Sequence, residues 1–445
     1  MLTLVVDIDS LRPDHVGAYG YSEPTTPNID RLAEDAVRFD RAYAANSPCM
    51  PARAGFLSGR YGIANGVATH EARAQTLAGP AAWEGFDGED SDYWTLPETL
   101  FQDRTRACAV SSFPRHPAPW FYHLWDEFHQ PREPAGEGEY FQTPRAETVA
   151  DRAIDCLDRH TEEDLFLYAQ FWNPHTPYNR SDEEIAQFDP PRPEYPTDEQ
   201  IASQQADDHW RCASQQGIED AADLLETLAH YDAEIHYCDR HVGRLLDALR
   251  ERNVYEEALI VLLADHGEEF GEHGLYSEHW STHEGTQRIP LLVKPPGGAR
   301  QGTSDALVTN VDLAPTILDY AGLDRPAAWQ GRSLRPLLTG ESTRWRERVV
   351  LDHGLYTAQR AVRTDRWKFV RTYHDGVWDL PERQLFDLDA DPHEQTDVAD
   401  AHPDVVTELE RAMACWAETH VGREEDALHA VARGGPAGLA WADEE

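Results

Sequence analysis

Short apolar runs and longer segments with apolar residues at helical spacing alternate along the first three quarters of this chain. The short runs have the length of buried strands, and the longer segments have the period of helices. The predicted strands are Leu2–Ile8, Ala107–Ser112, Leu165–Phe171, Ala258–Leu263 and Ile289–Lys294. The predicted helices are one that opens at Thr26-Pro27, Ala146–Arg159, Ile218–Arg252 as one long helix or two, and Val311–Tyr320. This alternation predicts an α/β fold with a large, mostly parallel sheet flanked by helices.

A different pattern begins near Trp345. Four short segments alternate apolar and polar residues as strands do, and an amphipathic helix, Pro403–Glu418, follows them. These four segments are Val349–Asp352, Gln359–Thr364, Trp367–Thr372 and Gln384–Asp387. They predict a small antiparallel sheet with one covering helix. We therefore expect an α/β domain over residues 1–340, an antiparallel α+β subdomain over residues 341–425 and a disordered tail over residues 426–445.

Two stretches rich in proline and acidic residues interrupt the α/β pattern. They are Pro114–Gly138 and Asp182–Ala206. Loops of this length are uncommon inside compact domains unless they serve a function. We predict that both form surface loops or lids.

The charge of the chain is strongly negative. Lys and Arg number 39 against 81 Asp and Glu, which gives a formal net charge of −42. Such a field repels nucleic acids and anionic membrane surfaces, so we expect neither as a partner. A surface this acidic and poor in lysine is typical of proteins from a high-salt cytoplasm, where salt screens the self-repulsion. The composition predicts a halophilic protein of haloarchaeal type.

Cysteine usage and the first residues bear on the cellular compartment. The six cysteines show no CxxC pair and no spacing typical of disulfides. The opening run Leu2–Val6 is too short and uncharged for a signal peptide, and no apolar stretch approaches the length of a membrane span. We expect a cytoplasmic location.

Cys49 stands at a place suited to anion chemistry. Pro51 fits the first turn of a helix, and Gly59 offers a C-terminal stop. Free backbone N–H groups and the helix dipole favour an anion at such an N-terminus. Arg53 adds a planar guanidinium that fits tetrahedral oxyanions. For an isolated cysteine the alternative is a buried structural residue.

Acidic residues follow two of the predicted strands. Asp9 comes directly after the first strand, and Asp265-His266 follows Ala258–Leu263. Hard divalent cations prefer carboxylates gathered at the carboxyl ends of neighbouring strands. Taken singly, each acid could equally be a helix cap or a turn residue.

Several basic side chains are candidates for handling an anionic substrate. His175 lies between Pro174 and Pro177, which fix its backbone after a predicted strand. Arg115 and His116 follow another strand, and we predict that they grip substrate. His70 is a further substrate-binding candidate, with a surface histidine as the equal alternative.

The segment Cys49-Met50-Pro51-Ala52-Arg53, followed by Leu57-Ser58-Gly59-Arg60, resembles the signature of the sulfatases. The resemblance implies oxidation of Cys49 to formylglycine by a formylglycine-generating enzyme. Hydration of that aldehyde gives two hydroxyls, one to attack sulfur and one to help expel the product. Ala52 stands where the family usually has serine.

The resemblance also implies a metal site formed by Asp9, Asp265, His266 and the modified Cys49. Many arylsulfatases have a second acid where this chain has Ser10, and asparagine where it has His266. The Asp-His set is similar to that of phosphonate monoester hydrolases of the same alkaline phosphatase-like superfamily. Ca²⁺ is the expected ion, with Mg²⁺ as an alternative. Mn²⁺ is a further alternative, because histidine makes the site softer than one formed only by oxygen ligands.

By the same resemblance, two histidines act on the substrate. His175 is placed near the nucleophile and leaving group, and His279 falls where most members carry lysine. A protonated His279 could bind the anion or protonate the leaving oxygen. Arg53 supports the nucleophile and the developing charge. Arg363–Lys368 and Leu385–Pro392 also resemble the C-terminal subdomain of sulfatases.

These observations predict a metal-dependent hydrolase of sulfate monoesters, acting on a small-molecule or oligosaccharide sulfate. A phosphonate monoester or phosphodiester hydrolase with the same site is one alternative, because sulfate and phosphate esters share a tetrahedral shape. A non-catalytic relative that only binds sulfated or acidic glycans is the other.

Overall fold

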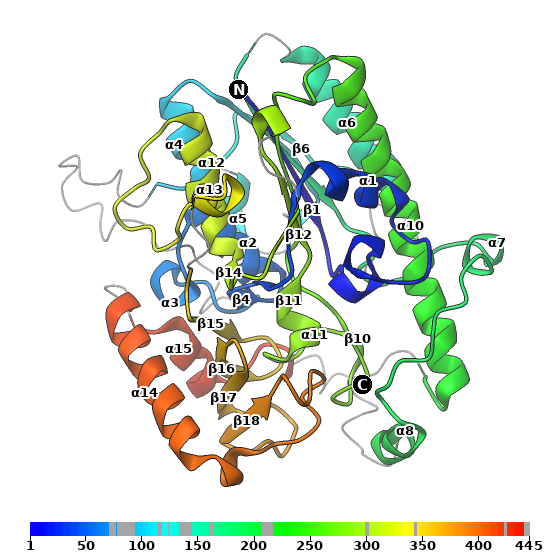
Figure 1. Ribbon diagram of the computed structural model, residues 1–445, viewed down its shortest axis with the longest axis vertical. Helices are drawn as coiled ribbons and strands as arrows, with labels where there is room; N and C mark the ends of the chain where they lie inside the picture. Colours follow the sequence, from blue (N-terminus) through cyan, green and yellow to red (C-terminus); the bar gives the residue numbers. More distant parts are fainter. Residues whose placement is uncertain are drawn as a thin grey trace.

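The computed structural model describes residues 1–70, 77, 94–113, 118–122, 124–132, 145–160, 163–205, 217–298, 302–341, 345–421 and 425–439. An eight-stranded sheet forms the centre of the larger part of the molecule (Figure 1). Its strand order is β13-β2-β12-β8-β1-β7-β5-β6. In that order the strands are Gly302–Ser304, Val37–Phe39, Leu291–Lys294, Leu259–Ala264, Leu2–Ile8, Leu165–Phe171, Arg106–Val110 and Glu127–His129.

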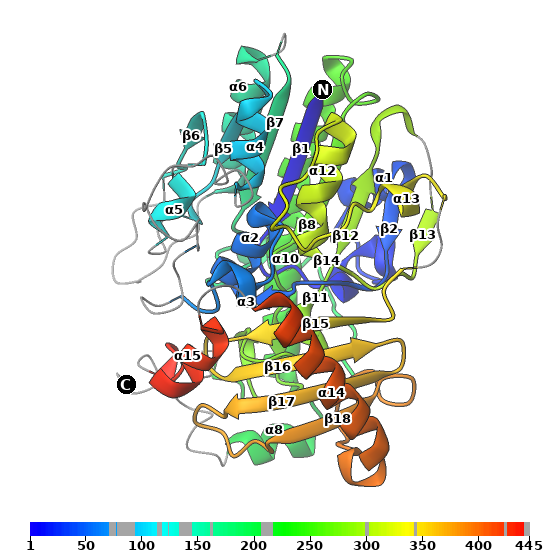
Figure 2. The ribbon, with the colours of Figure 1, turned by 90° about the vertical axis from the view of Figure 1, so that its left-hand side faces the viewer.

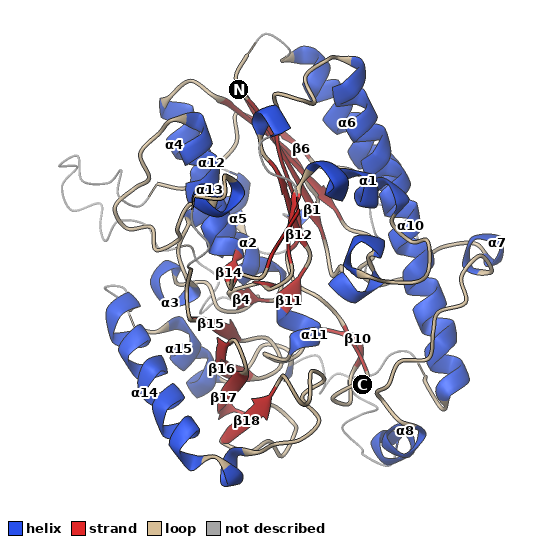
Figure 3. Ribbon diagram, viewed as in Figure 1, coloured by secondary structure: helices blue, strands red, loops and turns tan. Residues whose placement is uncertain are grey.

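The middle of this sheet is parallel and buried on both faces. β1 pairs in parallel with both β7 and β8, and β5 pairs in parallel with β7 and β6. Helices cover both faces, which is why these strands are continuous apolar runs (Figure 3). On one side lie α1 (Pro27–Asp35), α6 (Ala146–Arg159) and α10 (Ala221–Glu251), and on the other α2 (Cys49–Ser58), α4 (Leu96–Gln102) and α12 (Leu313–Ala321).

A second, five-stranded sheet packs beside the first (Figure 2). Its order is β18-β17-β16-β15-β4, formed by Arg383–Asp387, Trp367–His374, Ala358–Thr364, Arg348–His353 and Asn46–Ser47. Helix α14 (Pro403–His420) covers it by packing Leu409 and Met413 against the sheet. β4 comes from the N-terminal half of the chain and pairs in parallel with β15. The junction between the two sheets therefore lies immediately before Cys49.

Most predicted elements are confirmed, including the α/β class and the long helix, which is one helix. Helix α2 ends at Gly59, whose φ of 60° is left-handed and where a Cβ would lie 2.6 Å from the Trp329 ring. The strand predicted over Ile289–Lys294 is divided at Pro290, which has no N–H for a ladder. Its first part, β11 (Arg288–Ile289), joins a small sheet with β3 (Ala42–Tyr43) and β14 (Val308–Thr309).

The two predicted lids contain more regular structure than their composition indicates. The described part of 114–138 holds α5 (Pro119–Tyr122) and β6, the edge strand of the large sheet. The segment 182–206 holds α7 (Asp182–Ile185) and α8 (Asp198–Gln205). Elements of three to eight residues are too short for a periodic apolar pattern, so the sequence did not indicate them.

The C-terminal tail differs from the prediction. Residues 426–434 were expected to be disordered, but Ala427–Gly434 forms helix α15. Leu428 and Val431 pack with Ala358 of the five-stranded sheet. Asp426 caps the helix and pairs with buried Arg360. An eight-residue helix gains its stability from these contacts, which local sequence does not reveal.

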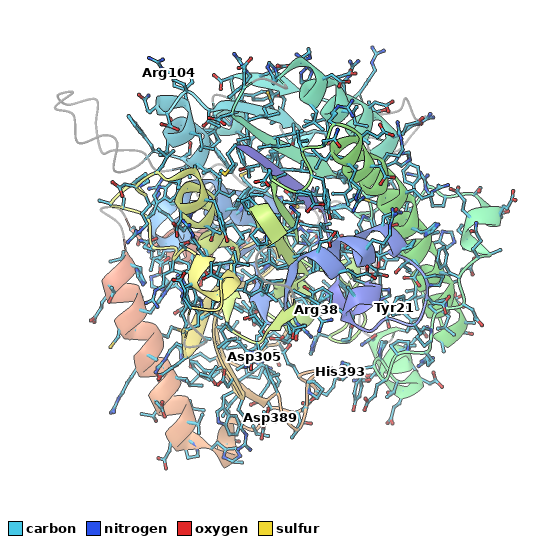
Figure 4. All side chains as sticks on the ribbon, turned by 45° about the horizontal axis from the view of Figure 1, so that its top comes forward. Tyr21, Arg38, Arg104, Asp305, Asp389 and His393 are labelled. Carbon is cyan, nitrogen blue, oxygen red and sulfur yellow. The ribbon has the colours of Figure 1, made fainter. Side chains whose placement is uncertain are left out.

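Five further short helices and strands lie in the described chain. They are α3 (Gly62–Asn65), β9 (Glu269–Phe270), β10 (Tyr276–Glu278), α11 (Glu284–Gln287) and α13 (Arg335–Leu338). Among the described residues, no helix is both long and apolar enough to cross a bilayer. Charged side chains such as Arg104, Asp305 and Asp389 lie on the surface (Figure 4).

Candidate active site

Parallel pairing of β1 with β8 brings two distant acids together. Ile8 lies opposite Ala264 at the carboxyl ends of these strands, and Asp9 and Asp265 are the residues that follow. Helix α2 begins beside them at Cys49, whose side chain is 1% exposed. The candidate nucleophile and the two candidate metal ligands are therefore neighbours, as the sequence predicted.

Four donor groups converge at this point. One ligand atom each of Asp9, Cys49, Asp265 and His266 lies within 4.8 Å of all the others. Sγ of Cys49 is 3.1 Å from Nε2 of His266, and that nitrogen is 3.4 Å from Oδ2 of Asp265 and 3.8 Å from Oδ1 of Asp9. All four residues are buried.

The orientation of His266 is set by the backbone. Its Nδ1 lies 2.7 Å from the carbonyl oxygen of Gly267, a position that suits an Nδ1–H donor. The lone pair of Nε2 then faces Cys49 and the two acids, which is the tautomer that a metal ligand needs. Asp265 is held as well, because its Oδ1 accepts hydrogen bonds from the backbone N–H groups of Ser10 and His266.

Arg53 binds carboxylates rather than facing open space. Its NH1 donates to Oδ2 of Asp265 at 2.7 Å and its NH2 to Oδ2 of Asp9 at 3.0 Å. Its Nε donates to Oδ2 of Asp7 at 2.8 Å and contacts the hydroxyl of Tyr168 at 3.2 Å. Every nitrogen of the guanidinium is thus engaged, so Arg53 fixes the acids that surround the nucleophile.

Two residues of this cluster were not among the sequence candidates. Asp7 lies within β1 and Tyr168 within β7, and the Tyr168 hydroxyl donates to Asp7. The only sequence signal was a carboxylate inside an otherwise apolar strand, Leu2–Ile8. A buried acid in such a strand requires a partner, and here the partner is Arg53.

Burial sets the protonation of the cluster. It raises the pKa of Asp265, with Asp9 and Asp7 adding to the effect and Arg53 opposing it. It also raises the pKa of the Cys49 thiol, as do Asp9 and Asp265. For Asp9 burial acts in the same sense, but the attraction of Arg53, His175 and His266 outweighs it and lowers the pKa. The site concentrates negative charge in a low dielectric.

A second group of side chains with ligand atoms also includes Cys49. Ligand atoms of Cys49, His175 and His279 lie within 4.8 Å of one another, so both predicted histidines reach Cys49. Nδ1 of His279 is 3.0 Å from Oε1 of Glu268, and Nδ1 of His175 is 2.7 Å from the Thr176 carbonyl oxygen. Sequence reasoning missed Glu268, although it stands two residues after His266. Burial raises the pKa of Glu268 to about 8.

Of the three predicted substrate-binding residues, the structure describes one, His70. His70 is buried, and its Nε2 accepts a hydrogen bond from the backbone N–H of Met50 at 3.2 Å, in the first turn of α2. It therefore lies next to Cys49 and is not a surface histidine. Arg115 and His116 lie outside the described residues.

The donors fit a divalent cation. Asp9 and Asp265 offer carboxylate oxygens, His266 offers a nitrogen with its lone pair directed inward, and position 49 offers a side chain at the same point. One guanidinium, that of Arg53, forms ion pairs with all three carboxylates of Asp7, Asp9 and Asp265. The remaining negative charge suits a hard or borderline cation.

Comparison with protein families decides the relationship. The family model described as sulfatase matches residues 2–323. The chain belongs to the sulfatase family. A second model, described as the C-terminal part of N-sulphoglucosamine sulphohydrolase, matches residues 271–418. Sulfatases are sulfuric ester hydrolases, so the expected enzyme class is confirmed.

Known proteins resemble this sulfatase over most of its length. An N-acetylglucosamine-6-O-sulfatase of Bacteroides thetaiotaomicron is 25% identical, with 86% of this chain and 80% of the relative covered. A protein solved with its substrate D-glucosamine-2-N,6-O-disulfate has a TM-score of 0.76 at 21% identity, covering 96% of this chain and 99% of that one. A phosphonate monoester hydrolase from Silicibacter pomeroyi has a TM-score of 0.75 at 21% identity, covering 95% and 96%. A phosphonate monoester hydrolase thus shares the fold of this sulfatase.

Proposed function

We propose that this sulfatase hydrolyses sulfate monoesters through a formylglycine formed from Cys49. The observation that carries the proposal is the convergence of side chain 49 with Asp9, Asp265 and His266 within 4.8 Å at the start of α2. Hydrated formylglycine supplies two hydroxyls, one to attack sulfur and one to help expel the product, and a bound divalent ion supplies Lewis-acid polarisation of the sulfate.

The surrounding residues divide the remaining tasks. Arg53 keeps Asp9 and Asp265 oriented through one charge-assisted hydrogen bond to each. His175 and His279 stand within reach of position 49, where they bind the anion or hold the proton for the leaving oxygen. The N-terminal turn of α2 adds a favourable dipole beside position 49, and His70, which accepts a hydrogen bond from the Met50 N–H, remains a candidate for binding the substrate. Arg115 and His116 remain candidates for gripping the substrate.

Ca²⁺ is our proposed ion, with Mg²⁺ and Mn²⁺ as the alternatives. The two aspartates favour a hard cation, and the imidazole of His266 makes the set compatible with Mn²⁺. Loading of the purified protein with each ion, followed by activity and thermal shift measurements, separates the three.

The proposed substrate is a small-molecule or oligosaccharide sulfate ester. One relative is named as an N-acetylglucosamine-6-O-sulfatase, which supports a sulfated sugar. The proposed partner is a formylglycine-generating enzyme. A halophilic, haloarchaeal-type protein with a cytoplasmic location is our accompanying proposal, and the net charge of −42 supports the halophilic part.

Mass spectrometry of the peptide that contains Cys49 tests the nucleophile. Protein from its native host, or from a host with a formylglycine-generating enzyme, should show the aldehyde at position 49. Its activity on an aryl sulfate should disappear in Cys49→Ala and persist in Cys238→Ala, which removes a buried thiol from α10. An unmodified Cys49 thiol in fully active protein would refute the proposal.

A phosphonate monoester or phosphodiester hydrolase is the second candidate. The observation in its favour is His266, which gives the site an imidazole beside the two aspartates. Aryl sulfate and aryl phosphodiester substrates with the same leaving group separate the two, because the leaving-group chemistry is then held constant. A higher kcat/KM for the aryl phosphodiester than for the aryl sulfate would favour this second candidate over sulfate monoester hydrolysis. Absence of both activities in modified protein would favour a non-catalytic glycan-binding relative.

A further inference from the structure

Five side chains with metal-binding atoms gather at the edge of the large sheet, away from the active site. Cys108 lies within β5, directly opposite Glu127 of the edge strand β6, and His129 is two residues farther along β6. Cys156 and His160 stand one helical turn apart, at the C-terminal end of α6 and the residue after it. In Figure 2 this edge lies at the upper left, at the opposite end of the molecule from β16 to β18.

The ligand atoms of these residues are close together. Those of Cys108, Glu127 and His160 lie within 4.8 Å of one another, and so do those of Glu127, His129 and Cys156. Nε2 of His160 is 2.7 Å from Oε2 of Glu127, and Sγ of Cys108 is 3.8 Å from the same oxygen. Glu127 is thus shared by both groups.

The cluster already contacts one cation, the guanidinium of Arg159, with which a metal ion would compete. Nε2–H of His160 donates to Oε2 of Glu127 at 2.7 Å, and Nδ1 lies 3.3 Å from Oε1 of Glu163, so a cation bound at Nε2 would replace the Nε2 proton while Glu163 accepts from Nδ1–H. The guanidinium of Arg159 contacts Glu127, lies 3.0 Å from Nε2 of His129 and lies 3.4 Å from Sγ of Cys156. A positive group therefore already contacts three of the five donors.

The kind of donor indicates the kind of ion. Two thiols and two imidazoles are the ligands of tetrahedral zinc sites, and a carboxylate can join or replace one of them. Hard ions such as Ca²⁺ and Mg²⁺ prefer oxygen ligands and would disfavour the sulfurs. We propose that Cys108, Glu127, His129, Cys156 and His160 form a binding site for a zinc-class divalent cation, separate from the active site.

The position of the site favours a structural role. β6 is a three-residue edge strand joined to the sheet through β5, and it lies in a region that the sequence predicted to be a loop. An ion shared by β5, β6 and α6 would cross-link this strand to the helix that covers it. Ion binding to the folded state would raise its stability by mass action.

The site is distinct from the catalytic cluster in the fold. Cys108 is in the middle of β5, whereas Asp9 follows the end of β1, and β7 lies between these two strands. Neighbouring strands are about 4.8 Å apart, so β5 and β1 are about 10 Å apart. Among the described residues, this cluster shares no donor with the catalytic one.

Cobalt spectroscopy tests the site in the full-length chain. Cys49→Ser serves as the background, because it removes the thiol of the active site. Titration with Co²⁺ should produce thiolate-to-cobalt charge-transfer absorption that saturates at one ion per chain and is displaced by Zn²⁺. The absorption should be lost when Cys108→Ser and Cys156→Ser are added, and it should persist with Cys238→Ser as the matched buried-thiol control.

Two variants keep the test decisive if the double serine variant does not fold. His160→Asn leaves both thiols in place and should weaken Co²⁺ binding by roughly tenfold or more, as loss of one ligand does. Arg159→Ala keeps all five donors and removes the competing cation, so it should tighten binding. Circular dichroism confirms the fold of each variant.

Three results would overturn the proposal. One is the absence of charge-transfer absorption in folded Cys49→Ser protein. Another is a band that survives loss of Cys108 and Cys156 or is unaffected by His160→Asn. The third is a disulfide between Cys108 and Cys156, detected by mass spectrometry without reduction, because it would consume both thiolates. The catalytic assignment is unaffected by any of them, since Cys49 is absent from the cobalt assay.

Discussion

Sγ of Cys49 lies 3.1 Å from Nε2 of His266, although 217 positions of sequence separate the two residues. The first begins helix α2, and the second follows strand β8. The contact places the proposed nucleophile against a proposed metal ligand. Carboxylate oxygens of Asp9 and Asp265 lie within 4.8 Å of both side chains. The two acids therefore border the proposed nucleophile as well as the proposed metal ligand.

Asp265→Asn should separate metal binding from folding. The variant keeps the shape of the side chain but removes one carboxylate charge from the site. We expect kcat/KM for an aryl sulfate to fall by at least about 10²-fold, with partial recovery when the divalent ion is raised after EDTA treatment. Asp319→Asn, on a partly exposed pair with Arg335, is the control and should retain activity. Full activity of Asp265→Asn in EDTA would contradict a metal role.

Arg53→Lys should destabilise the protein more than its conserved charge suggests. Arg53 holds Asp7, Asp9 and Asp265 with separate nitrogens, whereas the single ammonium of lysine cannot match that geometry. Breaking buried ion pairs typically costs about 3–5 kcal/mol, and we expect a loss of that order in the free energy of unfolding. Denaturant unfolding measures it.

The matched control is Arg366→Lys. Arg366 forms a bidentate pair with Asp387 at the surface, and its side chain is 52% exposed. Exposed pairs contribute little to stability because water and salt screen them, so this substitution should change little. Equal effects of the two substitutions would mean that the buried guanidinium does not organise the acids.

Asp239 should make stability depend on pH. This residue of α10 accepts hydrogen bonds from the backbone N–H groups of Asn28 and Ile29 at the start of α1. Burial nevertheless raises its pKa to about 6. A carboxyl whose pKa is higher in the folded state binds protons more tightly there, so its contribution to stability is lost as the pH rises from about 4 to about 6.

Asp239→Asn removes this dependence. Wild-type protein should lose stability relative to the variant over that interval, by up to about 1.4 kcal/mol per pH unit. Denaturant unfolding at several pH values measures the difference. Asp247→Asn, on an exposed pair of the same helix, should run parallel to wild type. A difference between wild type and Asp239→Asn that is flat with pH would refute the linkage.

Asp426→Ala should release helix α15 without unfolding the domain. Asp426 caps this helix through the backbone N–H of Leu428 and pairs with buried Arg360. We expect faster amide hydrogen exchange over Ala427–Gly434 and a cost of about 1–3 kcal/mol, because Arg360 loses one of its two carboxylates. Glu425→Ala removes an exposed pair with Arg433 next to it and is the control. Unchanged exchange in α15 would contradict the anchoring.

Salt should stabilise the protein. The net charge of −42 creates self-repulsion in the folded state. Raising KCl from about 0.1 M to about 1 M shortens the screening length from about 10 Å to about 3 Å, so Tm should rise steeply over that interval. Sucrose at equal water activity is the control for general solute exclusion. A Tm that is independent of KCl, or that follows sucrose equally, would argue against a halophilic protein.

Local patterns were sufficient for most of the fold. Apolar runs identified β1, β7 and β8, and helical spacing identified α6 and α10. The short strand β6 and helix α15 were missed, because three to eight residues give no reliable period and their stability comes from tertiary contacts.

The active-site residues also divide into those that local patterns identified and those that only tertiary contacts reveal. Cys49, Asp9, Asp265, His266 and the two histidines His175 and His279 were found as motifs and strand ends, and the fold brings them together. Glu268 and the Asp7–Tyr168 pair were missed, because their importance lies in contacts across β1, β7 and α2. For Arg53 the sequence suggested a substrate-facing guanidinium, whereas the structure directs it to three carboxylates.

The sequence alone determined which segments could be strands and helices and which side chains carry chemistry, because periodicity and residue type are local properties. The tertiary structure decided which of those side chains meet. Parallel strands end at one edge of a sheet, so acids far apart in the chain become neighbours there. It also decided where charge must be compensated, since only burial makes an unpaired carboxylate costly.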